Sequence, residues 1–233
     1  MKKNIKLKNI LIIYSKKSKS DIKCVEYLND FQIKLTRVFS KGVRKENLSN
    51  KINKWSGDYI IHLSSYYKLT KRDLKRAKIA LNFHPSPPKY PGSGGYSKAL
   101  FNLDKKFGVT VHYMNHKIDN GKIVGFYSFK INKKLTLEKL INKTNNFKFV
   151  VFKKILRELL SNNGENKILK LSNNNKLKWS KKRGKIKDID RIQKIGRFIS
   201  KSELERVIRS TSIGKYSPYI VLHGYKFELK INS

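Results

Sequence analysis

Short apolar runs alternate with amphipathic segments along the first part of the chain. Runs of strand length cover residues 9–15, 59–63 and 79–82, and residues 33–39 alternate apolar and polar side chains as a strand does. The segments between them, residues 22–31, 45–54 and 70–78, have helical spacing, and Asp21 stands where an N-cap is expected. Strands that alternate with helices predict an α/β fold, a Rossmann-like and mostly parallel sheet with right-handed crossovers.

The second part of the chain continues with different patterns. It predicts strands at 109–114 and 123–131, and helices at 96–103, 136–160, 189–198 and 201–209. Residues 161–187 are rich in Asn, Lys and Gly and are expected to form an exposed connection, and residues 219–222 and 225–231 flank His223-Gly224 as a hairpin. We therefore expect a main domain at 1–160, a connecting loop at 161–187 and a small C-terminal helical and β-hairpin segment at 188–233.

The charge of the 233-residue chain is strongly positive, with 54 Lys and Arg against 16 Asp and Glu. Such a charge invites a nucleic-acid partner through phosphate neutralisation. The lysines are spread over the whole chain rather than gathered in one patch, and Asn and Ile are also abundant. This composition fits an AT-rich genome without any binding function. Nucleic acid is therefore not the expected partner, although the field should speed encounter with polyanionic small molecules.

The sequence contains no pattern typical of a membrane span, and its single cysteine does not allow an intramolecular disulfide. No apolar run approaches the ~20 residues that span a bilayer, and the run at 10–14 is too short for a signal-peptide core. The single cysteine, Cys24, lies in an amphipathic segment and is interpreted as a packing residue in a reducing compartment. A cytoplasmic protein with no membrane partner is the expectation.

The stretch LNFHPSPPKYPGSGG, residues 81–95, ends regular structure abruptly. Proline fixes φ and glycine admits positive φ, so the sequence predicts a rigid loop. Asn82 and His84 share one face at the end of the preceding strand, where open α/β sheets bind ligands. Taken alone, this stretch is more typical of a structural histidine followed by an ordinary loop.

A second motif lies downstream, GVTVHYMNHKIDNGKIV at residues 108–124. With the first it resembles the folate-dependent formyltransferase family, whose pattern is Asn-x-His-Pro-Ser, a Pro/Gly loop, Gly-Val-Thr-x-His and Asp-x-Gly. The resemblance covers residues 10–124 well and is closest to sugar-nucleotide N-formyltransferases. Asn120 departs from the Thr or Ser that usually follows the Asp. Without the first motif, Asp119 would be interpreted as a turn residue, because Asp-Asn-Gly is a natural turn sequence.

The resemblance implies that Asn82, His84 and Asp119 are the catalytic residues. Formyl transfer is acyl transfer, which needs donors for the developing oxyanion and a group that accepts the amine's proton. Asn82 and His84 would be the donors, and Asp119 would orient the imidazole and help to remove the proton. No metal is required. His112 is a candidate for supporting the site from its strand. His62 is expected in the core or behind the catalytic residues, and His116 is expected to be exposed.

The implied formyl donor is N10-formyltetrahydrofolate. Its pterin would lie against residues 64–69 and 114–119, so Ser64, Tyr66, Tyr67, Met114 and Asp119 are the candidate cofactor-binding residues. Tyr66 and Tyr67 are equally compatible with covering the core.

The acceptor implied by the resemblance is a nucleoside-diphosphate-linked amino-deoxy sugar. The candidate substrate-binding residues are Gly94, Gly95, Arg209, Lys215, Tyr216 and Tyr219. The resemblance also implies a homodimer and a role in lipopolysaccharide O-antigen biosynthesis. Two alternatives are a methionyl-tRNA formyltransferase, for which the C-terminal segment is short, and a non-catalytic nucleic-acid-binding protein on the same scaffold.

Overall fold

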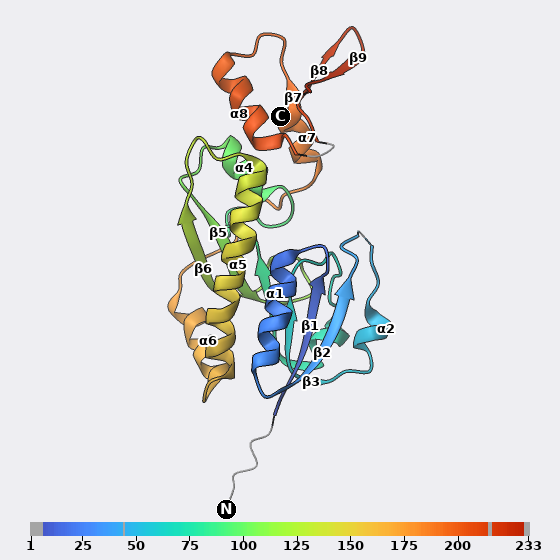
Figure 1. Cartoon of the computed structure of the whole chain (residues 1–233), viewed down its shortest axis with the longest axis vertical. Helices are drawn as coiled ribbons and strands as arrows, with labels where there is room; N and C mark the ends of the chain where they lie inside the picture. The colour runs from blue at the N-terminus through green and yellow to red at the C-terminus, as the bar shows by residue number, and fades with distance from the viewer. Residues whose placement is uncertain (1–6, 44, 214–215, 231–233) are drawn as a thin grey trace, which may run out of the picture. The chain divides into compact units, whose positions relative to one another are not determined.

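The computed structural model describes residues 7–43, 45–213 and 216–230. Most of its elements are labelled in Figure 1. The strands are β1 (Lys8–Ser15), β2 (Ile33–Ser40), β3 (Gly57–His62), β4 (Ala77–His84), β5 (Lys106–Tyr113), β6 (Ile123–Lys130), β7 (Lys194–Ile195), β8 (Tyr219–Leu222) and β9 (Tyr225–Glu228). The helices are α1 (Lys19–Tyr27), α2 (Ser49–Ile52), α3 (Lys71–Leu74), α4 (Gly95–Phe101), α5 (Leu137–Leu160), α6 (Gly164–Asn174), α7 (Lys187–Gln193) and α8 (Lys201–Thr211).

The main sheet has six strands in the order β2-β1-β3-β4-β5-β6. Strands β1 to β4 are parallel, and β5 is antiparallel to β4. The expected α/β fold with a mostly parallel sheet is therefore confirmed. A second, small sheet in the order β7-β8-β9 contains the predicted hairpin, whose turn residues His223 and Gly224 both have positive φ.

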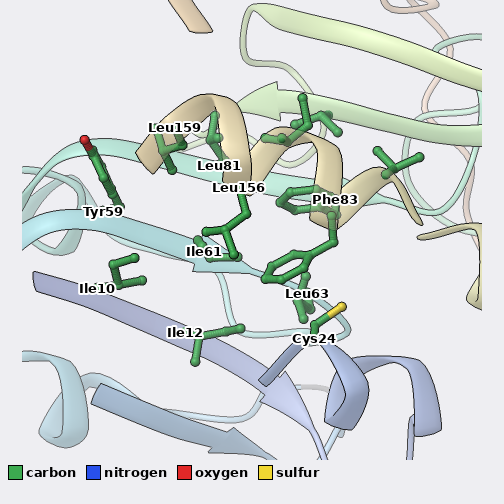
Figure 2. Close-up of a cluster of buried hydrophobic side chains, with 14 of the residues drawn as sticks. Ile10, Ile12, Cys24, Tyr59, Ile61, Leu63, Leu81, Phe83, Leu156 and Leu159 are labelled. Atoms are coloured by element: carbon green, nitrogen blue, oxygen red, sulfur yellow. The ribbon is translucent and has the colours of Figure 1, made fainter. Parts of the chain in front are cut away.

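Alternate side chains of the parallel strands point to two separate apolar cores. Ile10 and Ile12 of β1 pack with Ile61 of β3, with Cys24 of α1 and with the C-terminal part of α5 (Figure 2). Leu11 and Ile13 of β1 pack on the other face. Their partners there come from α2 and its flanking residues, from β3 and from the segment between β3 and α3, and include Leu48, Ile52, Trp55, Ile60, Tyr67 and Leu69. Because both faces are covered, the strands read as continuous apolar runs.

The contacts divide the chain into two compact units. Unit 1 comprises residues 1–85, 109–127 and 145–178, and unit 2 comprises residues 86–108, 128–144 and 179–233. The boundaries between the two units fall within β5, β6 and α5. The division into domains at 1–160, 161–187 and 188–233 stays a prediction. Unit 2 has its own core, which includes Tyr90, Ala99, Leu100, Phe107, Leu137 and Leu140.

Several local predictions need correction. The N-cap of α1 is Ser18 rather than Asp21, because the Ser18 side chain accepts the backbone N–H of Asp21. Residues 161–187 are not only a connection, since they contain the eleven-residue helix α6. The helix predicted at 189–198 begins earlier and ends at Gln193, where the short strand β7 follows. The helices predicted at 45–54 and 70–78 shrink to four residues each.

Among the described residues, no helix is both long enough and apolar enough to cross a bilayer.

Candidate active site

The candidate catalytic residues Asn82 and His84 lie on β4, between β3 and β5. The register places His62 of β3 and His112 of β5 on either side of Asn82, and Thr110 of β5 opposite His84. Residues Asn82 and His84 are two positions apart on one strand and therefore point to the same face of the sheet. The site thus begins where β3 and β4 reach their carboxyl ends.

The structure brings Asn82, His84 and Asp119 together. The Asp119 Oδ2 lies 3.4 Å from the His84 Nδ1, and its Oδ1 lies 3.4 Å from the Asn82 Nδ2. His84 and Asp119 are buried, with 7% and 8% of their surfaces exposed. One carboxylate therefore faces both the imidazole and the amide, which is the arrangement that their proposed roles need.

Asp119 reaches this position from a tight turn between β5 and β6. Its φ is +45°, in the left-handed region that Asp tolerates better than most residues. Two positions on, a Cβ at Gly121 would lie 1.6 Å from the Tyr113 carbonyl oxygen, so the backbone approaches too closely for any side chain. Asp119 is therefore both a turn residue and a candidate site residue. The glycine two positions after it is required because no side chain fits beside the Tyr113 carbonyl oxygen.

Two further histidines contact the Asn82 side chain. The His112 Nε2 lies 3.0 Å from the Asn82 Nδ2 and 3.6 Å from the Asp119 Oδ1. The His62 Nδ1 lies 3.3 Å from the Asn82 Oδ1, and its Nε2 lies 3.1 Å from the Tyr67 carbonyl oxygen. Burial lowers the pKa of His62. His116 is exposed, as expected.

The residues predicted to bind the folate have different surroundings. Tyr67 is buried and donates its hydroxyl to Asp73. Burial raises the pKa of the phenol, and the hydrogen bond to Asp73 adds to this effect. Tyr66 is 56% exposed. Met114 packs against the core that contains Leu11, and its N–H donates to the Ala80 carbonyl. Residues 64–69 and 114–119 follow directly after the strands that hold His62 and His112, so both segments flank Asn82 and fit a ligand placed there.

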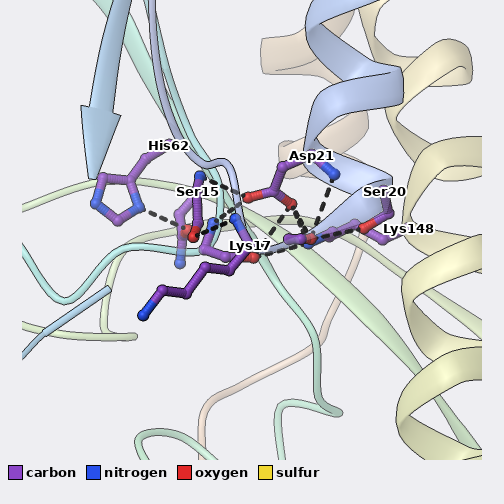
Figure 3. Close-up of polar contacts among 9 residues, drawn as sticks. Ser15, Lys17, Ser20, Asp21, His62 and Lys148 are labelled. Atoms are coloured by element: carbon purple, nitrogen blue, oxygen red, sulfur yellow. Dashed lines mark hydrogen bonds and ion pairs between the residues drawn. The ribbon is translucent and has the colours of Figure 1, made fainter. Parts of the chain in front are cut away.

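A buried ion pair stands beside the first of these segments, and sequence reasoning missed it (Figure 3). The Lys148 Nζ of α5 lies 2.6 Å from the Asp21 Oδ1 and 2.9 Å from the Ser64 Oγ. Asp21 also accepts the backbone N–H groups of Ser15 and Ser64. The sequence did contain a sign that Lys148 is buried. It lies four positions from both Thr144 and Phe152, so it falls in the apolar stripe of α5. Ser64, a candidate cofactor ligand, is therefore held by charged partners.

The predicted substrate-binding residues that the structure describes belong to unit 2. Gly94 precedes α4 with a φ of +82°, and a Cβ on Gly95 would lie 2.1 Å from the Ser86 Oγ. Arg209 donates to the carbonyl oxygens of Leu100, Asn132 and Lys133, a structural use of its guanidinium.

Of the remaining candidates, Tyr219 donates its hydroxyl to Asp190, and Tyr216 is 43% exposed. Lys215 lies outside the described residues. The substrate role of all six residues stays a prediction. Within the described part of the chain no group of His, Cys, Asp and Glu could hold a metal ion, and the expectation of a metal-free reaction likewise stays a prediction.

Comparison with known proteins gives a family and a set of similar folds. The family model described as formyl transferase matches residues 1–156. The bifunctional polymyxin resistance protein ArnA of Wigglesworthia glossinidia brevipalpis is 34% identical over 54% of this chain and 22% of its own length. The methionyl-tRNA formyltransferase of Rickettsia rickettsii is 30% identical over 45% of this chain and 35% of its own length. The chain thus spans about a third or less of these relatives.

Solved structures match nearly the whole chain. A sugar N-formyltransferase from Shewanella sp FDAARGOS_354 has a TM-score of 0.71 at 16% identity and covers 97% of this chain and 98% of its own. A 4-N formyltransferase from Francisella tularensis has a TM-score of 0.74 at 16% identity, with 96% and 97% coverage. An N-formyltransferase from Helicobacter canadensis, in complex with folinic acid and dTDP-3-aminofucose, has a TM-score of 0.64 at 19% identity, with 88% and 80% coverage. At these identities the likeness is one of fold.

Proposed function

Since the chain belongs to the formyl transferase family, we propose that it moves a formyl group from N10-formyltetrahydrofolate to the amino group of a nucleotide-linked amino sugar. The observation that carries the proposal is the convergence of Asn82, His84 and Asp119 on one point at the end of β4. An amide, an imidazole and a carboxylate around one position suit acyl transfer to an amine.

Each of the three residues has a distinct task. Asp119 faces the Nδ1 of His84, so it orients the ring and favours its protonated form. The other nitrogen, Nε2, is then the donor that we assign to the formyl oxygen. The Asn82 amide is the second donor. Its bond to Asp119 is long, at 3.4 Å, and is the contact that a formyl oxygen would replace most easily. Asp119 would receive the amine's proton, directly or through a water.

The donor would bring the formyl group itself. Two observations support a folate donor: residues 64–69 and 114–119 flank Asn82, and the similar fold from Helicobacter canadensis was solved with folinic acid. The Asp21–Lys148 pair fixes Ser64 at the start of the first segment. The task of that segment is to present its backbone groups to the ligand in one conformation.

A sugar acceptor is supported by the extent of the fold match. The sugar N-formyltransferase from Shewanella covers 97% of the chain, and the Helicobacter protein was solved with dTDP-3-aminofucose. Methionyl-tRNA is the second candidate, because relatives with that name match the sequence and the chain has a net charge of +38.

A formyl-transfer assay decides between the acceptors. The protein is incubated with N10-formyltetrahydrofolate and, in parallel, with dTDP-, GDP- and UDP-linked amino sugars and with methionyl-tRNA. We expect turnover with a nucleotide-linked amino sugar. Asn82→Ala serves as the inactive control, and Lys139→Met, at an exposed position of α5, serves as the active control. Turnover with methionyl-tRNA alone would favour the second candidate. Binding of tRNA without any turnover would support only a nucleic-acid-binding protein.

A further inference from the structure

His62, Asn82 and His112 form a row across three neighbouring strands. The register pairs His62 of β3 with Asn82 of β4, and Asn82 with His112 of β5. Directly paired residues of adjacent strands project from the same face of the sheet. The Asn82 amide therefore lies between two imidazole rings, with its Oδ1 3.3 Å from the His62 Nδ1 and its Nδ2 3.0 Å from the His112 Nε2.

The outer nitrogen of each ring faces a backbone carbonyl. The His62 Nε2 lies 3.1 Å from the Tyr67 oxygen, and the His112 Nδ1 lies 2.8 Å from the Tyr113 oxygen. A carbonyl oxygen only accepts hydrogen bonds, so each outer nitrogen carries its hydrogen. A neutral imidazole has a single N–H. If both rings were neutral, both inner nitrogens would present lone pairs to the amide.

The amide cannot satisfy two lone pairs from opposite sides. Its NH₂ end can donate to one ring, but its oxygen would then face the lone pair of the other ring. Every contact in the row is a hydrogen bond only if one inner nitrogen also carries a hydrogen. The row then contains one imidazolium and one neutral imidazole.

We propose that the row His62–Asn82–His112 holds one extra proton, shared between its two inner nitrogens, and that this proton decides which end of the Asn82 amide faces the formyl group. With the proton on His62, the amide oxygen faces His62 and the NH₂ faces His112 and Asp119, as in the structure. With the proton on His112, the amide turns and its NH₂ faces His62. His62 is therefore a positioning residue for Asn82, and this part of the inference rests on the proposed function.

The charged and titratable groups around the row support a bound proton. Asp119 lies 3.6 Å from the His112 Nε2 and supplies a negative charge, and its other oxygen faces His84. On the side of α3, the neighbouring groups are Tyr67 and Asp73, which are bonded to one another. Burial lowers the pKa of His62, which opposes a permanent charge on that ring.

The first test needs no substrate. The resting protein, labelled with ¹⁵N in its histidines, is measured by NMR at neutral pH, with His62→Gln and His112→Gln used to assign the rings. We expect the two rings together to show one imidazolium, and Asn82→Leu to make both neutral. Two neutral rings in the unchanged protein, or an imidazolium that persists in Asn82→Leu, would overturn the inference. Because no turnover is involved, this result is independent of whether formyl transfer is the correct function.

The second test is kinetic, in the assay established for the active protein. His62→Phe removes the donor, and we expect kcat to fall about tenfold while both KM values stay unchanged. His62→Gln places an amide donor beside Asn82 and should regain most of the rate. In the unchanged protein kcat should fall at alkaline pH, where the row loses its proton, whereas in His62→Gln it should not. In an Asn82→Ala background, His62→Phe should change kcat less than about twofold.

A purely structural role predicts a different pattern. His62→Gln would then be as slow as His62→Phe, or the effects of His62→Phe and Asn82→Ala would multiply, and either result rejects the inference. Lys139→Met, at an exposed position of α5, is the control and should leave kcat and both KM values unchanged. The thermal unfolding midpoint of each variant shows whether a lower kcat comes from a damaged fold or from a misoriented Asn82 amide.

Discussion

The ammonium of Lys148 lies 2.6 Å from the carboxylate of Asp21, and the two side chains are 1% and 0% exposed. The pair connects α5 with the first turn of α1, and through Ser15 and Ser64 it reaches the ends of β1 and β3. A buried charge without its partner is costly, whereas a complete pair roughly compensates its own desolvation. The pair therefore makes the fold intolerant of change at either residue.

Lys148→Met should lower the free energy of unfolding by about 3–5 kcal/mol, because it leaves the Asp21 carboxylate buried and unpaired. Asp21→Asn combined with Lys148→Met removes both charges but keeps an oxygen for the backbone N–H groups. We expect the double variant to be more stable than Lys148→Met by about 1–2 kcal/mol. Urea unfolding followed by circular dichroism measures both, with exposed Lys139→Met as the control. Purely additive losses would contradict the pairing.

Asn82→Ala should lower kcat by about 10²–10³, because it removes one of the two donors that we assign to the formyl oxygen. Asp119→Asn should be at least as slow, since a neutral amide neither favours the imidazolium of His84 nor accepts a proton. Steady-state kinetics with the accepted amine measure both effects. The thermal midpoints should remain close to that of the unchanged protein, and a near-normal kcat in either variant would refute the roles proposed here.

Gly121→Ala should both destabilise the protein and slow the reaction. Its Cβ would lie 1.6 Å from the Tyr113 carbonyl oxygen, the acceptor of the His112 Nδ1, so the turn that carries Asp119 must shift. We expect a loss of more than about 2 kcal/mol in unfolding free energy, together with a lower kcat. The matched control is Gly196→Ala, whose Cβ would meet nothing within 4 Å. Equal behaviour of the two variants would argue against a strained approach at Gly121.

The Asp188 carboxylate should increase the free energy of unfolding at neutral pH, and this contribution should be lost in acid. The backbone N–H of Lys185 and the ammonium of Lys98 lower the pKa of this carboxyl from 3.8 to about 2. A depressed carboxyl pKa stabilises the folded state above the unfolded value, and that stability is lost as the pH falls toward the folded value. The difference in unfolding free energy between the unchanged protein and Asp188→Asn should therefore shrink between pH 3.8 and about 2. A pH-independent difference would assign the effect to packing.

The strands, the long helix and the two motifs were readable from the sequence because each depends on local periodicity or local backbone chemistry. Apolar runs gave β1 and β3, and the spacing of apolar residues gave α5. The Pro/Gly loop after His84 and the Asp-Asn-Gly turn were also predicted from residue types alone. The family pattern then linked Asn82, His84 and Asp119 before any distance was known.

The folded chain alone revealed what each side chain faces. Asp21 was mistaken for an N-cap because a carboxylate before an amphipathic segment has the same local pattern whether it caps the helix or pairs with a distant lysine. His62 and His112 become partners of Asn82 only through strand register, which depends on contacts far apart in the sequence. Periodicity reports which face of an element is buried, whereas a polar site needs the neighbour across the sheet, and the tertiary structure supplies that neighbour.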